Sequence, residues 1–145
     1  MSFDKIIIIL LILLLIIYKI YKIHSGIYDK KKDIPYNHSL INIDIIYIFS
    51  LFLLAISCIL IYSPYYLKFV WIGNCIETIV FFIWSYIYWK SRNTIKRILE
   101  LKTLKPKEVI ENLDSFNFKG KTILSLFFSL FNLWGTIIEI IKTFF

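Results

Sequence analysis

Polar side chains recur along one face of the last apolar segment of this chain, residues 122–142. Their spacing alternates between three and four residues, which places them within an arc of about 80° on a helix. Hydroxyl, amide and carboxyl groups arranged this way can hydrogen-bond to a second helix or hold a proton or cation. In lipid, such groups turn towards protein. This polar face contains Ser125, Ser129, Asn132, Thr136, Glu139 and Thr143.

A shorter polar face follows the apolar segment 69–89, within an arc of about 100°. Counting residues from the segment ends puts Glu77 level with Asn132 and Ser85 level with Ser125 in an antiparallel pair. We therefore expect the two segments to pack through a series of polar contacts. Cysteines at either of these two pairs of positions should cross-link. The shorter face contains Asn74, Glu77, Thr78, Ser85 and Tyr88.

Glu77 is the most unusual residue of this set, because its carboxyl lies about 12 Å from the nearer end of its segment. A charged group at such depth is costly, and no lysine or arginine lies in the apolar cores to pair with it. A protonated Glu77 hydrogen-bonded to Asn132 is the leading interpretation. A proton or cation site and a contact with a partner subunit remain open. Glu139 lies nearer a segment end and is expected to be solvated.

The remaining residues offer no catalytic arrangement. The sequence lacks a phosphate-binding loop, a serine nucleophile motif, an HExxH motif and a CxxC motif. His24 and His38 lie in a polar linker, whereas Cys58 and Cys75 lie in apolar runs and are expected to be buried thiols. We predict no enzyme activity, no metal and no cofactor.

The composition is that of an integral membrane protein. Of 145 residues, 59% are hydrophobic, against about 45–50% in a soluble domain. The apolar residues form runs long enough to cross a bilayer as helices. We predict an all-α bundle of four transmembrane helices in a single membrane domain, the first run being a retained anchor. The expected spans are about 6–23, 43–62, 69–89 and 122–142.

Three segments connect these spans. Residues 24–42 form a polar linker, after which Asn42 is expected to cap the second helix and to leave Asp44 in its first turn. A tight turn is expected at 63–68.

The segment 90–121 is the longest polar stretch. It contains an amphipathic stretch, 91–104, and a second short helix that starts at Pro106. Gly120 is expected to end the segment. The amphipathic stretch suits either the membrane surface or a docking partner.

The distribution of charge predicts the orientation. With the N-terminus outside, 14 of the 17 basic residues lie on the inner side, which the positive-inside rule favours. We therefore expect a protein of the cell membrane, either plasma or inner membrane. Both termini should lie on its outer side, and loops 24–42 and 90–121 should lie in the cytoplasm. This topology accounts for the net charge of +7, so we predict no nucleic-acid partner. Candidates for contact with lipid headgroups are Lys30, Lys31, Lys32, Arg92, Lys96 and Arg97.

Function is predicted only as a class. The leading interpretation is a non-enzymatic protein that acts by helix–helix contact with a membrane protein partner or a second copy. It would be of accessory, immunity or exclusion type, and its likeness to such proteins is one of size and composition. The alternatives are an oligomeric ion or proton channel or transporter component centred on Glu77, and a holin-like pore former.

Overall fold

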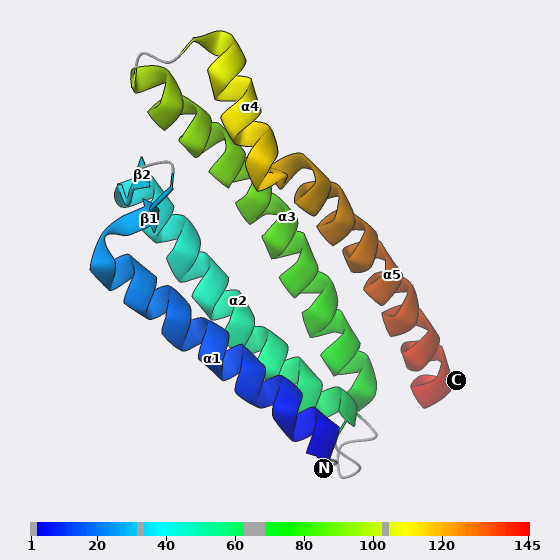
Figure 1. The fold of residues 1–145 in the computed structure, drawn as a ribbon. Helices are drawn as coiled ribbons and strands as arrows, with labels where there is room; N and C mark the ends of the chain where they lie inside the picture. The colour runs from blue at the N-terminus through cyan, green and yellow to red at the C-terminus, as the bar shows by residue number, and fades with distance from the viewer. Residues whose placement is uncertain (1–2, 32–33, 63–68, 103–104) are drawn as a thin grey trace.

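A computed structural model describes residues 3–31, 34–62, 69–102 and 105–145. The turn expected at 63–68 lies outside these residues. Apart from two short strands, every element is a helix (Figure 1). The elements in order are α1 (Phe3–Ser25), β1 (Ile27–Asp29), β2 (Ile34–Pro35), α2 (His38–Tyr62), α3 (Val70–Leu101), α4 (Pro106–Phe116) and α5 (Phe118–Phe144).

Four helical stretches are long and apolar enough to cross a membrane, as the sequence predicts: α1, α2, α3 and the stretch that contains α4 and α5. The two chain ends lie at the same end of the molecule, and the strands and α4 lie at the opposite end (Figure 1). An even number of long helices that alternate in direction produces this arrangement.

The four long helices form an open row rather than a closed bundle. In the described residues α3 packs most extensively against α5 and then α2, while α1 packs on α2, and no comparable contact joins α1 to α5. The expected bundle is therefore corrected to a row with α1 and α5 at its edges. The physical reason is that α1 buries only a narrow stripe, Ile12 and Ile16. Its other apolar side chains suit lipid.

Helix α3 is longer than the sequence predicts. It continues without a break from Val70 to Leu101, so the amphipathic stretch 91–104 is largely the extension of the third span. Ser91, Ile95 and Leu99 are buried on one face of this extension, in continuation of the buried stripe within the span. No helix breaker separates the two parts.

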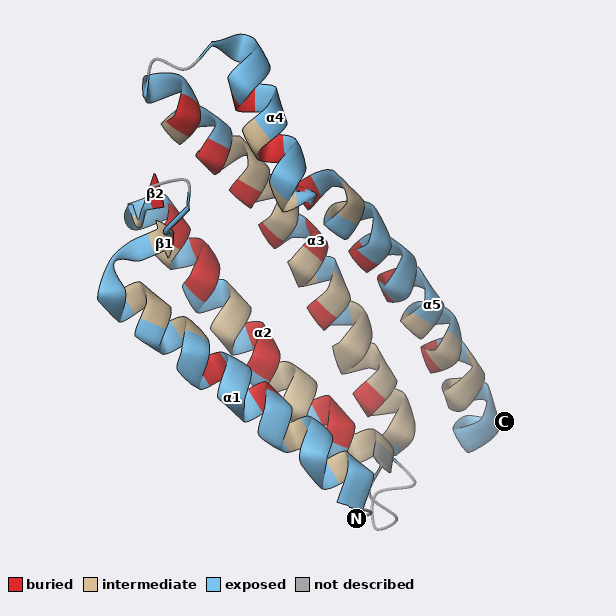
Figure 2. Cartoon of the chain, in the orientation of Figure 1, coloured by how far each residue is buried: buried red, intermediate tan, exposed pale blue. Residues whose placement is uncertain are grey.

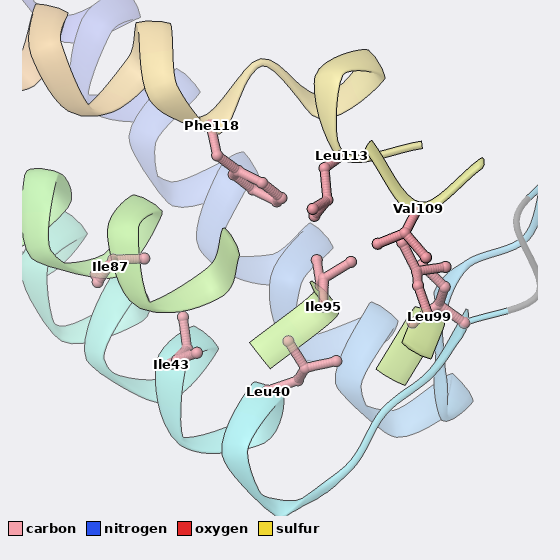
Figure 3. Packing of buried hydrophobic residues seen from close by; sticks show 9 residues of the cluster. Leu40, Ile43, Ile87, Ile95, Leu99, Val109, Leu113 and Phe118 are labelled. Carbon is pink, nitrogen blue, oxygen red and sulfur yellow. The ribbon is translucent and has the colours of Figure 1, made fainter. Parts of the chain in front are cut away.

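Helix α4 begins with Pro106 at its first turn, as predicted, and covers the extension of α3 with Val109 and Leu113. Figure 3 shows these side chains pointing towards Ile95 and Leu99. The extension and α4 therefore form a small apolar core beyond the apolar part of the spans, completed by residues of α2 and by Phe118.

The break between α4 and α5 lies at Asn117 and not at Gly120. Asn117 has φ of 54°, a left-handed conformation that asparagine tolerates better than most residues. Gly120 lies inside α5, where an added Cβ would be 2.6 Å from Oδ1 of Asn117. Glycine at position 120 thus makes room for the Asn117 side chain.

The linker between the first two spans is structured. Strands β1 and β2 form an antiparallel pair, and α2 begins earlier than predicted, at His38. The backbone N–H of Leu40 donates to Oδ1 of Asn37 at 2.8 Å. Asn37, and not Asn42, is therefore the residue that caps α2, and Asp44 lies in the second turn rather than the first.

Burial follows the contacts between helices. Figure 2 shows buried positions where helices face one another and long exposed stretches along α1 and α5. Exposed side chains of these two helices include Leu14, Ile17, Phe127 and Phe131, which suit contact with lipid. A second apolar cluster, containing Ile12, Ile16, Leu51 and Cys58, joins α1 to α2.

Candidate functional site

The interface between α3 and α5 contains the packing that the two polar faces predict. The Ser129 hydroxyl of α5 donates to the Thr78 carbonyl oxygen of α3 at 2.9 Å. Beside this bond, the rings of Phe81 and Phe128 lie with centroids 5.5 Å apart. These contacts place the two antiparallel helices in nearly the same alignment as that obtained by counting residues inward from the ends of segments 69–89 and 122–142. Buried polar residues of this interface are Ser85, Ser125, Ser129 and Thr136.

Most hydroxyls near this interface bond within their own helix. Ser85 donates to the Phe82 carbonyl at 2.8 Å, and Thr136 donates to the Asn132 carbonyl at 2.8 Å. Thr78 likewise donates to the carbonyl of Asn74, which is half-buried. A carbonyl three or four residues earlier is the nearest acceptor for a helical hydroxyl. The expected series of polar contacts is thus reduced, in the described residues, to one hydrogen bond between α3 and α5.

Glu77 does not pair with Asn132. Its half-buried carboxyl lies beside the Ser57 hydroxyl of α2, near Cys58. Ser57 is fully buried and donates its proton to the Leu54 carbonyl at 2.7 Å. Glu77 therefore lies at the contact of α3 with α2 rather than at that of α3 with α5.

Asn132 lies midway along α5 and is only partly buried. One N–H of its amide donates to the Phe128 carbonyl of its own helix at 3.0 Å. Within the described chain no other hydrogen bond of this amide is found. Asn132 therefore carries spare hydrogen-bonding capacity at the centre of an apolar span.

Glu139 and the basic candidates lie towards the two ends of the molecule. Glu139 pairs with Lys142 at 3.8 Å near the C-terminus, where Thr143 is exposed. Lys32 lies outside the described residues. The other headgroup candidates divide between the strand segment, with Lys30 and Lys31 exposed, and the extension of α3, with Arg92 half-buried and Lys96 and Arg97 exposed.

A buried charge cluster at the strand end was not expected from the sequence. Asp44 is only 4% exposed, and its carboxylate accepts a short hydrogen bond from the Tyr36 hydroxyl. The Lys19 ammonium lies 3.6 Å from the same carboxylate and 5.2 Å from the centroid of the Tyr47 ring. The cluster joins α1 to α2 and to the residue that follows β2.

One sequence signal could have revealed this cluster. Lys19 lies as many residues before the end of α1 as Asp44 lies after the start of α2. Opposite charges at equal depth on consecutive antiparallel helices can pair. The cluster was missed because α2 was expected to start later, which placed Asp44 in the first turn, where the helix dipole alone accounts for a carboxylate.

The cluster also affects two tyrosines outside the spans. Burial, followed by the hydrogen bond to Asp44, raises the pKa of Tyr36 above its ordinary value. Burial, followed by the charge of Asp44, raises the pKa of Tyr28 in the same direction. Both phenols therefore remain protonated donors at neutral pH.

Cys58 and Cys75 are free thiols. In the described ranges no three histidine, cysteine, aspartate or glutamate side chains converge as metal ligands. Comparisons with family models, curated proteins and solved structures find no match.

Proposed function

We propose that this chain is a non-enzymatic, multi-pass protein of the plasma or inner membrane that acts by helix–helix contact along the free edge of α5. The observation that supports the proposal is Asn132, an amide with unused donors and acceptors midway along a helix whose extensive packing, within the described residues, is against α3. An amide in hydrocarbon is stabilised by a hydrogen bond to another helix. A second copy of the chain or another membrane protein would supply that helix.

The proposed orientation has both termini outside. Its support is the shared position of the chain ends (Figure 1) and the concentration of basic residues in segments 24–42 and 90–121. The positive-inside rule then assigns the strand end to the cytoplasm. Accessory, immunity and exclusion roles all fit a small protein of this kind.

Cross-linking in native membranes tests the proposal. The full chain is cross-linked, extracted in mild detergent and affinity-captured, and the captured polypeptides are identified by mass spectrometry. Asn132→Leu should reduce the cross-linked species about tenfold, whereas Asn132→Gln keeps the amide and should retain it. A species that is absent, or equally abundant in both variants, would contradict a role for this amide.

An ion or proton conductor centred on Glu77 is the second candidate. The observation in its favour is a half-buried carboxyl within a span, beside a serine hydroxyl. Glu77→Gln should abolish flux in vesicles if this candidate holds, and should leave a contact protein unaffected. A holin-like pore former would instead collapse the membrane potential on overexpression.

A further inference from the structure

A cavity of about 240 Å³ opens at the strand end of the row, between α1, β1, α2, α3 and the junction of α4 with α5. It lies where the apolar parts of the spans end, at the depth of lipid headgroups in the proposed orientation. It is smaller than the pockets that enclose drug-sized ligands, which measure about 300–1,000 Å³. Its size suits a small polar group.

Two lysines on the wall of this cavity lie against aromatic rings. The Lys22 ammonium lies 4.9 Å from the centroid of the Tyr28 ring, and the Lys121 ammonium lies 5.6 Å from that of Tyr88. The two ion pairs found in the described residues, Lys19 with Asp44 and Lys142 with Glu139, involve neither of these ammonium groups. Cation–π contacts orient both lysines without neutralising them.

The third lysine on the wall is different. Lys19 is paired with Asp44, whose other oxygen accepts from Tyr36. This pair contributes a rigid and nearly neutral part of the wall. With Asp29 also present, three lysines stand against two aspartates, so the cavity has a net charge of +1.

Hydroxyl donors complete the wall. Ser91 is only 3% exposed and lines the cavity, yet no hydrogen bond of its hydroxyl is found in the described residues. The same holds for the phenols of Tyr28, Tyr47 and Tyr88, which also line the cavity. Among the described residues no buried side-chain oxygen lacks a hydrogen-bond partner, so these four hydroxyls are open to the cavity rather than enclosed in the protein. A ligand rich in acceptor oxygens would supply partners for all four.

From this arrangement we infer that the cavity binds the phosphate group of a small anionic ligand, with Lys22 and Lys121 as charged donors and Ser91 and Tyr88 as neutral donors. Lysine recognises phosphate as a point charge, so the site needs no bidentate arginine. The ligand is either the headgroup of an anionic phospholipid or a soluble phosphate monoester. The inference is independent of the proposed contact along α5.

Native mass spectrometry of the full chain in detergent tests the inference, with phosphatidic acid as the lipid probe. Lys22→Gln combined with Lys121→Gln should weaken binding about tenfold or more, since each lysine near an anionic surface contributes measurably to affinity. Lys105→Gln combined with Lys107→Gln removes the same charge from exposed sites outside the cavity and should change binding less than about twofold. Equal losses in the two double variants would overturn the inference, because general attraction would then explain binding.

Two milder variants decide the case if the double variant fails to fold. Ser91→Ala and Tyr88→Phe each delete one hydroxyl and should each weaken binding about threefold or more, as expected for the loss of one hydrogen bond. Unchanged affinity in both would overturn the inference. Asp29→Asn should strengthen binding, since it removes a negative charge from the wall.

The source of the phosphate is distinguished by competition. If glycerol 3-phosphate in excess displaces phosphatidic acid, the cavity accepts a soluble monoester. If the lipid is retained, the ligand is a headgroup held also by its acyl chains. Binding of neither probe would overturn the inference. Asn132→Leu should leave lipid binding unchanged, which separates this test from that of the proposed function.

Discussion

The Ser129 hydroxyl donates across the helix interface to the Thr78 carbonyl oxygen, 2.9 Å away. This bond joins α5 to α3 at the middle of both spans. It requires a small side chain on α5, because the Ser129 side chain is buried against the backbone of α3. The contact therefore determines both the depth and the closeness of the two helices.

Substitutions at Ser129 should separate the hydrogen bond from the packing. Ser129→Ala should lower the free energy of unfolding by about 0.6 kcal/mol, the average for such bonds between transmembrane helices. Ser129→Leu should cost about 1–3 kcal/mol, because the larger side chain does not fit. Unfolding in SDS measures both values. Phe131→Leu, at an exposed position of the same helix, is the control and should have little effect.

Two glycines should respond to alanine in opposite directions. A Cβ on Gly73 would lie 2.6 Å from Cγ1 of Ile61 and 3.1 Å from the Ser57 carbonyl oxygen, whereas a Cβ on Gly135 would meet nothing within 4 Å. Gly73→Ala should push α3 from α2 and lower the unfolding free energy by about 1–3 kcal/mol. Gly135→Ala should raise it by about 0.5–1 kcal/mol. A Gly73→Ala variant that is as stable as the original chain, or more stable, would show that α2 and α3 do not approach closely at Gly73.

Cysteine cross-linking tests where Glu77 points. In a background with Cys58 and Cys75 replaced by alanine, Glu77→Cys should cross-link with Ser57→Cys on α2, because the two side chains lie together. Glu77→Cys with Asn132→Cys should cross-link poorly, contrary to the expectation from depth alone. Rapid oxidation in native membranes followed by gel electrophoresis compares the yields. Preferential cross-linking to position 132 would contradict the structure.

The charge cluster of Lys19, Tyr36 and Asp44 should stabilise the end of the molecule that contains the two strands. Asp44→Asn should lower the unfolding free energy by about 1.5–3 kcal/mol, since hydrogen bonds to charged groups contribute about that much. It also leaves the Lys19 ammonium without its carboxylate. Lys19→Met should therefore partly restore stability to Asp44→Asn, which a double-mutant cycle measures. Glu111→Gln, at an exposed position on α4, controls for charge removal. Additive effects at positions 19 and 44 would show that the two residues do not interact.

The amino-acid pattern by itself predicts how many long helices form and where they lie, because a backbone in hydrocarbon has few ways to satisfy its hydrogen bonds. A run of about 20 apolar residues must satisfy its backbone internally and therefore forms a helix. The buried face of α5 follows from the same rule, since Ser125, Ser129 and Thr136 are buried as their spacing predicts. Pro106 marked the start of α4 for a local steric reason.

Tertiary structure decided which neighbour each face meets. Depth along a span can be counted from the sequence, but the direction of a side chain around the helix axis depends on where the neighbouring helices lie. Glu77 has the depth of Asn132 and faces Ser57 instead, because α3 packs against both α2 and α5. The pairing of Lys19 with Asp44, and the cavity beside it, likewise required α1 and α2 to be placed side by side. Local sequence rules decide where helices form, whereas long-range packing decides which polar groups meet.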